Sequence, residues 1–159
     1  MSENEGWNCL NIGPLRALED LESLILKNLG IVDLGGLEGK KLRILALVDL
    51  PKLTYLSKLI NFPQIDSLIL INTGIKDFSV LKETNIKNIY FGEFEFNANI
   101  EETLSNLNTL KSINSVPVHE WRKIPHYKKS RLLKYKIDPK VGVEFKVSLG
   151  NSLYIFYIN

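Results

Sequence analysis

Apolar positions recur in the first two thirds of the chain as one triplet: an apolar residue, two others, a second apolar residue, one other, and a third. Four segments contain it, namely Leu21/Leu24/Leu26, Leu42/Leu45/Leu47, Ile65/Leu68/Leu70 and Ile86/Ile89/Phe91. Their starts at 21, 42, 65 and 86 are 21 to 23 residues apart. Because successive side chains of a strand face opposite ways, the second and third apolar residues of each triplet point to one side. The pattern predicts short strands stacked as a parallel sheet.

The segments between the triplets predict how the chain returns from one strand to the next. Apolar residues at three-residue spacing follow the first three triplets, for example over residues 33–40 and 78–83. This spacing suits short helices or 3-10 turns on the convex side. Weaker triplets flank the array and predict a leading and a trailing turn, Trp7/Leu10/Ile12 and Leu107/Leu110/Ile113.

These residues resemble the leucine-rich repeat family, with repeats of 21 to 23 residues over positions 7–116. Residues 65–75 are most similar to the family pattern. Leu29, Leu50 and Thr73 stand where the family has a ladder of Asn or Cys, and Asn28 and Asn72 lie one position earlier. The resemblance implies an α/β solenoid with a parallel sheet on the concave side and short helical or 3-10 returns on the convex side. It also implies a recognition scaffold, so we expect a non-enzymatic protein that binds a protein partner. The compact chain adds the narrower hypothesis of a small inhibitor or immunity-type protein.

The outward side of the predicted sheet is unusually apolar. The in-phase positions place there Ile25, Ile44, Ala46, Val48, Ile69, Ile71 and Tyr90. An exposed apolar patch marks an interaction site, and an aromatic residue among aliphatic ones suits an anchor. We therefore predict that these residues bind the partner. The alternative is that the C-terminal region folds back over them and makes them part of the core.

The C-terminal end predicts a β-hairpin. Residues 141–149 alternate, Gly150 and Asn151 form a two-residue turn signal, and residues 152–158 resume as a strand. That turn pairs Val147 with Tyr154, Phe145 with Phe156 and Val143 with Ile158. An isolated hairpin is marginally stable in water, so it must dock. We expect it at the open edge of the sheet; the concave face and a second subunit, giving a homodimer, are the alternatives. Residues 1–116 are then the repeat array, and residues 117–159 a connector and cap in the same compact domain.

Charge divides the chain at the same point. Residues 117–140 contain eight basic and two acidic residues, a local charge of +6, whereas residues 1–116 contain 11 basic and 15 acidic residues, or −4. Aromatic residues interleave with the cations. This pattern suits an acidic protein partner or, as the alternative function, RNA or DNA along residues 119–140. A solvated connector explains it equally. The predicted basic patch consists of Arg122, Lys123, Lys128, Lys129, Arg131 and Lys134.

The sequence contains little that indicates catalysis, and we expect no metal or cofactor. His119 and His126 lack the four-residue spacing of a zinc helix. We interpret the acidic cluster of the fourth return as a solvated loop with apolar plugs, rather than an acid/base pair. A single cysteine, no secretory signal and no run of about 18 apolar residues lead us to expect a cytoplasmic protein and no membrane partner. The acidic cluster consists of Glu93, Glu95, Glu101 and Glu102.

Overall fold

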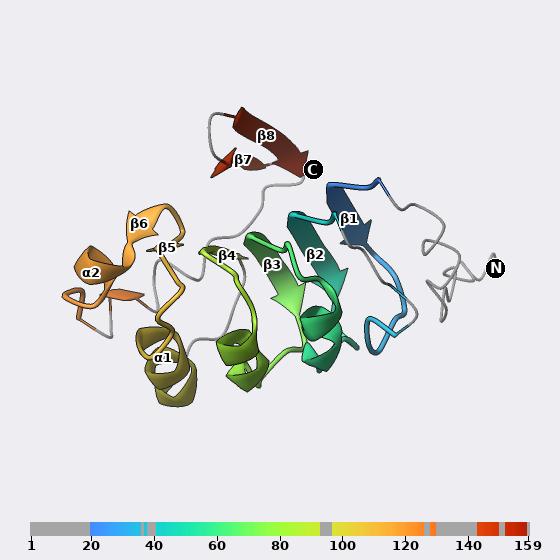
Figure 1. Cartoon of the computed structure of the whole chain (residues 1–159). Coiled ribbons are helices and arrows are strands. Elements are labelled where there is room, and N and C mark those ends of the chain that lie inside the picture. The colour runs from blue at the N-terminus through green and yellow to red at the C-terminus, as the bar shows by residue number, and fades with distance from the viewer. Residues whose placement is uncertain are drawn as a thin grey trace.

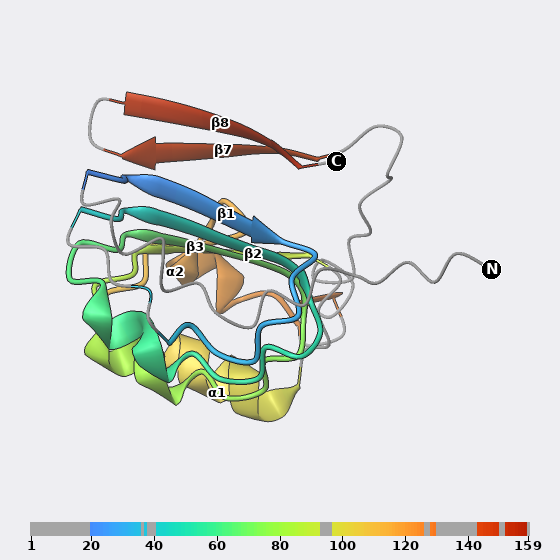
Figure 2. The ribbon, with the colours of Figure 1, turned by 90° about the vertical axis from the view of Figure 1, so that its right-hand side faces the viewer.

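A computed structural model describes residues 20–35, 37, 41–92, 97–125 and 128–129, together with the backbone of residues 143–149 and 152–158. These residues form a six-stranded sheet and a separate two-stranded sheet (Figure 1). Helical segments lie on one side of the larger sheet (Figure 2). The protein therefore belongs to the α/β class.

The larger sheet follows the order of the chain. Neighbouring strands from β1 to β5 are parallel, and β6 is antiparallel to β5. Each of the first four strands contains the second and third apolar residues of a predicted triplet, which confirms the prediction of a parallel sheet in these segments. The strands are β1 (Ser23–Lys27), β2 (Ile44–Leu50), β3 (Ser67–Thr73), β4 (Asn88–Gly92), β5 (Ser112–Ile113) and β6 (Val116–Pro117).

The return segments cover one face of this sheet and close the main hydrophobic core. Two are 3-10 helices, η2 (Ser57–Asn61) and η3 (Ser79–Glu83), and each buries one leucine, Leu59 and Leu81 respectively. These leucines join the inward residues of the triplets in one buried cluster. The predicted 3-10 return over residues 78–83 is confirmed, while the described residues of the first return, 31–35 and 37, contain a turn and no helix.

The fourth return differs from the expected solvated loop. Residues Ala98–Ser105 form helix α1, whose first turn is capped because the Asn97 side chain accepts a hydrogen bond from the Ile100 amide at 3.0 Å. Ile100 and Leu104, four residues apart, lie on its buried face. The loop prediction is thus wrong for Glu101 and Glu102, which lie in this helix; Glu93 and Glu95 lie outside the described residues.

The helix also changes the register of the trailing turn. Ser67 pairs with Asn88, 21 residues later, whereas Asn88 pairs with Ser112, 24 residues later. Ile113 therefore stands opposite Ile89, the position that the triplet Leu107/Leu110/Ile113 had assigned to Leu110. A helical return needs more residues than a 3-10 return, so the strand that follows it is displaced along the sequence.

Polar residues in the left-handed backbone region end successive strands. Asn28, Asp49 and Asn72 have φ values of 54°, 51° and 48°. Asn and Asp tolerate this conformation better than other residues with a side chain. The Asn72 amide also donates to Asp49 Oδ1 at 3.0 Å across neighbouring strands. The turn positions are therefore one residue before those that the resemblance assigns to the ladder.

The predicted C-terminal hairpin is present as strands β7 (Val143–Leu149) and β8 (Ser152–Ile158). The three expected pairs, Val143 with Ile158, Phe145 with Phe156 and Val147 with Tyr154, are confirmed. It does not extend the larger sheet, so the expected docking at the sheet edge is wrong. In both ribbon views the hairpin lies over the face of the larger sheet opposite the helical returns (Figures 1 and 2).

Candidate functional site

The face of the larger sheet opposite the helical returns, here called the concave face, is built from three rows of side chains. Parallel pairing in register aligns residues of the same phase, so that Ile25, Ala46, Ile69 and Tyr90 are neighbours across four strands. Adjacent strands lie about 4.8 Å apart, so side chains from segments far apart in the sequence form one surface. The flanking rows are Ser23, Ile44, Ser67, Asn88 and Ser112 on one side, and Lys27, Val48, Ile71 and Gly92 on the other.

Most of this face is covered. The central residues Ala46 and Ile69 are fully buried, and Tyr90 is 6% exposed. Ile44, Val48 and Ile71 are buried as well, although none of these six belongs to the cluster beneath the sheet. The backbone of β7 and β8 lies over this face (Figures 1 and 2). The expectation that this face is open to solvent is therefore wrong for β2, β3 and β4, and the arrangement is the alternative in which the C-terminal region folds back.

The cover ends at β1. Ile25, the first residue of the central row, is 42% exposed. Lys27 beside it is partly exposed, whereas Val48, its partner on β2, is buried. Of the seven residues predicted to bind a partner, Ile25 alone is accessible in this arrangement. That any of the seven binds a partner stays a prediction.

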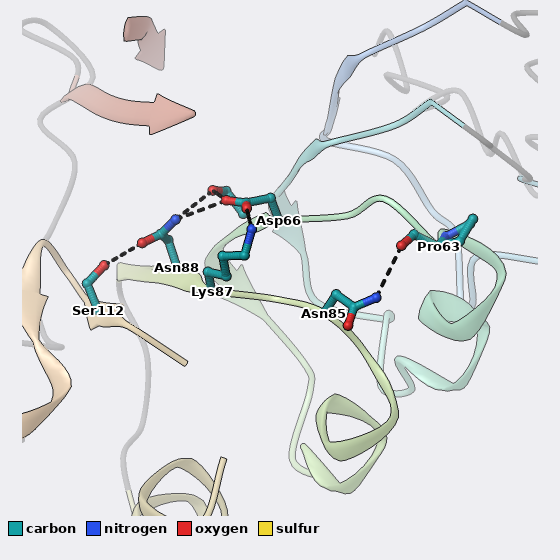
Figure 3. Close-up of polar contacts among 7 residues, drawn as sticks. Pro63, Asp66, Asn85, Lys87, Asn88 and Ser112 are labelled. Carbon is teal, nitrogen blue, oxygen red and sulfur yellow. Dashed lines mark hydrogen bonds and ion pairs between the residues drawn. The ribbon is translucent and has the colours of Figure 1, made fainter. Parts of the chain in front are cut away.

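A row of polar contacts borders the apolar rows at the start of the strands (Figure 3). Asp66, only 7% exposed, accepts from Lys87 Nζ at 2.8 Å and from Asn88 Nδ2 at 3.1 Å. Asn88 Oδ1 in turn accepts from the Ser112 hydroxyl at 2.8 Å. Because each contact joins neighbouring strands, the row fixes their register and satisfies a carboxylate that would be costly to bury alone.

Sequence reasoning did not identify this row, although a signal was present. Asp66 and Lys87 are 21 residues apart, which is one repeat, so their side chains fall on adjacent strands at equivalent positions. The same spacing separates the ion pair of Asp20 and Lys41 at the exposed start of β1 and β2. Opposite charges one repeat apart were therefore a detectable sign of lateral pairing.

Tyr90 is the one described tyrosine on the concave face. Burial raises the pKa of its hydroxyl, a hydrogen bond with Ser115 opposes that shift, and the charge of Asp66 adds to it. The hydroxyl thus keeps its proton at neutral pH and bonds within the chain. Its ring completes the central apolar row.

The structure divides the predicted basic patch. Arg122, Lys123 and Lys128 are exposed, and Arg122 Nη2 donates to the Ser105 carbonyl at 2.7 Å, at the end of α1. Lys129 is instead 3% exposed; it pairs with Glu101 and its Nζ lies 5.9 Å from the ring centre of Trp121. Lys129 therefore fastens the start of the C-terminal segment to α1 and to helix α2 (Val118–Trp121), and it is unavailable to a partner. Arg131 and Lys134 lie outside the described residues.

Candidate chemistry is sparse in the part of the chain that the structure describes. His119 Nε2 lies 3.7 Å from Glu120 Oε1, and both side chains are mostly exposed. Within the described ranges no three His, Cys, Asp or Glu residues gather as metal ligands would. Cys9 and His126 lie outside those ranges.

Comparison with protein-family models and with curated protein sequences finds no match to this chain. None of the helices among the described residues combines the length and the apolar character needed to cross a membrane.

Proposed function

We propose that residues 20–116 form a leucine-rich repeat solenoid and that the protein binds a protein partner on its concave face without catalysing a reaction. Four features support the repeat: parallel strands in chain order, a lateral register of one repeat, 3-10 returns on one face, and Asn or Asp in the left-handed region at the strand ends. The scaffold role is implied by the resemblance alone, because a fold by itself does not determine function.

The observation on which the proposal mainly rests is the composition of the concave face. Outward positions of a parallel sheet that faces water are normally polar, yet here three rows across β2, β3 and β4 are apolar except where Ser67 and Asn88 join the polar row. Such a surface is stable only beneath another apolar surface. The concave face therefore suits contact with a macromolecular partner or with the chain's own hairpin, and it extends beyond the part that the hairpin covers.

The accessible features describe the partner. Ile25 supplies an apolar contact at the uncovered end of the face, and Lys27 stands beside it. Arg122, Lys123 and Lys128 supply exposed positive charge on the segment that follows α2, which packs on β5 and β6 at the opposite end of the sheet from β1. A partner with an apolar patch and, at a distance of about the width of the sheet, a group of carboxylates matches both, because complementary charge guides association while the apolar contact supplies affinity. The narrower class, an inhibitor or immunity-type protein, stays a prediction from the sequence.

Two exposed residues allow a test that does not endanger the fold. Ile25 lies on the concave face, whereas Val32, 53% exposed, lies on a return segment. We use three tagged proteins to capture partners from the source cells: the unaltered chain, the Ile25→Asp variant and the Val32→Asp variant. The captured protein is then purified and titrated against each of the three. We expect Ile25→Asp to weaken binding at least about tenfold, because it places a charge in an apolar contact that the partner would bury, and Val32→Asp to leave it unchanged. Equal affinities for all three would contradict binding at the concave face.

The same titration tests the alternative of nucleic-acid binding. Lys123→Glu and Lys128→Glu remove charge from the exposed cations without touching Lys129. If RNA or DNA is the ligand, both variants weaken binding of a mixed-sequence oligonucleotide and affinity falls steeply with salt. The burial of Lys129 weighs against this outcome, because it leaves fewer cations for phosphates than the sequence suggested.

A further inference from the structure

We infer that the C-terminal hairpin is an internal occupant of the binding face, which a partner presenting an apolar antiparallel β-ribbon displaces. This inference rests on the proposed function, because it specifies how the concave face is regulated and which class of partner fits it. Among the described residues, the backbone of the hairpin lies over this face in both ribbon views (Figures 1 and 2). A partner that replaces it must offer the same kind of surface.

The attachment of the hairpin differs from that of any other strand. β1 to β6 are joined laterally by backbone hydrogen bonds, whereas β7 and β8 bond only to each other among the described residues. All seven hairpin pairs, from Val143 with Ile158 to Leu149 with Ser152, therefore remain intact when the hairpin leaves the face. Separation exposes apolar surface but leaves the backbone donors and acceptors of both sheets in the partnerships they already have, whereas removal of a strand from the larger sheet would break backbone hydrogen bonds as well.

The position of Lys129 and the exposure of Ile25 allow a partner to replace the hairpin on the concave face. Lys129, held by Glu101 and Trp121, fixes the chain, and 13 residues separate it from Val143, where β7 begins. A segment of 13 residues spans up to about 45 Å when extended, so the hairpin can leave while α1 and α2 stay in place. Ile25 is in register with buried Ala46 and Ile69. A partner can therefore make its first contact at β1 and advance along the same row as the hairpin withdraws.

Hydrogen exchange measured by mass spectrometry on the full chain tests the displacement. We expect the paired amides of β7 and β8 to exchange at least about 100-fold faster than those of β2, β3 and β4, because a hairpin that has left the face is marginally stable by itself, so its pairs then break without unfolding of the larger sheet. Equal protection of the two sheets would overturn the inference, since the hairpin would then open only with the whole domain.

Two adjacent residues of β7 provide matched variants. Phe145 pairs with Phe156 and Lys146 with Ile155, and alternation places them on opposite faces of the hairpin. Phe145→Asp charges the face that is apolar in sequence, so we expect faster exchange in β7 and β8 with unchanged protection in β2 to β4. Lys146→Asp should change neither. If the two variants behave alike, hairpin docking does not depend on its apolar face and the inference fails.

A labelled peptide probes the ribbon specificity of the face. Fluorescein-labelled peptide of residues 141–159 is titrated into the full chain and into Phe145→Asp, with anisotropy as the readout. We expect at least about tenfold tighter binding to Phe145→Asp, because its face is more often vacant. Equal binding to both chains, or none to either, would overturn the inference. These measurements need no natural partner, so their failure is distinguishable from failure of the Ile25→Asp capture experiment, which tests the proposed function.

Discussion

Two isoleucines of one row report whether the concave face is covered in solution. Ile69 is fully buried on β3 and Ile25 is 42% exposed on β1, and both occupy the central row. Truncation to alanine removes three carbons, worth about 0.8 kcal/mol each when buried. At Ile69 a cavity adds to this loss, so we expect Ile69→Ala to lower the free energy of unfolding by about 3 kcal/mol. At Ile25 burial is partial and no closed cavity forms, so the cost is about 1 kcal/mol.

Urea denaturation followed by circular dichroism measures the difference. With a slope of about 2 kcal/mol/M, the two midpoints should differ by about 1 M. Leu47→Ala, on the opposite and fully buried face of β2, is the control and should cost as much as Ile69→Ala. If Ile69→Ala costs no more than Ile25→Ala while Leu47→Ala costs about 3 kcal/mol, the face is open in solution and our account of its burial is refuted.

Three further predictions concern the chemistry of single positions. Burial raises the pKa of the Tyr90 hydroxyl, so the unfolded chain loses this proton at lower pH than the folded chain does. The free energy of unfolding therefore falls as the pH rises above the ordinary tyrosine pKa of 10.0. In urea titrations at pH 8 and pH 10.5, Tyr90→Phe should lose less stability between the two pH values than the unaltered chain. Gly74→Ala places a Cβ 2.3 Å from the Pro51 carbonyl oxygen and should cost about 3 kcal/mol. Gly35→Ala places its Cβ 2.7 Å from the end of the flexible Asp33 side chain, so it should lower the melting temperature much less than Gly74→Ala does. Asn72 has φ 48°, so Asn72→Ala should be about 1 kcal/mol less stable than Asn72→Gly, and equal stability would contradict the strain.

Local patterns predicted the strands well because each rests on a period that the backbone itself imposes. Alternation located the inward residues of β1 to β4, and a two-residue turn fixed all three expected hairpin pairs. The period failed where a return changed its form. Asn97 as a cap, with Ile100 and Leu104 four residues apart, was a helix signal, but we interpreted the acidic cluster of this return as a solvated loop and misplaced the next strand.

The destination of the hairpin could not be predicted in the same way. An outward apolar row has the same composition whether a partner or the chain itself covers it, and Ile69 gives no local sign of which applies. The choice depends on how two segments about 80 residues apart in the sequence are arranged, since β3 and β7 lie in different sheets. An edge position would have given the hairpin more backbone hydrogen bonds; the concave position instead covers the apolar rows of β2 to β4, and that burial is the larger gain.

The concave face can bind both the hairpin and a partner, because the two occupy it at different times. If the hairpin leaves the face for about 1% of the time, a partner's apparent affinity is reduced about 100-fold relative to the vacant face. Phe145→Asp raises the vacant fraction without altering Ile69 or Ile25, so the ratio of partner affinities for this variant and the unaltered chain measures how strongly the hairpin competes. Hydrogen exchange of β7 and β8 reports the same ratio independently, because the pairs of the hairpin break much more readily once it has left the face, so Phe145→Asp should raise their exchange rate by the factor by which it raises the vacant fraction. Agreement between the two is required if one face serves both occupants, and a partner that binds equally to both chains must use another surface.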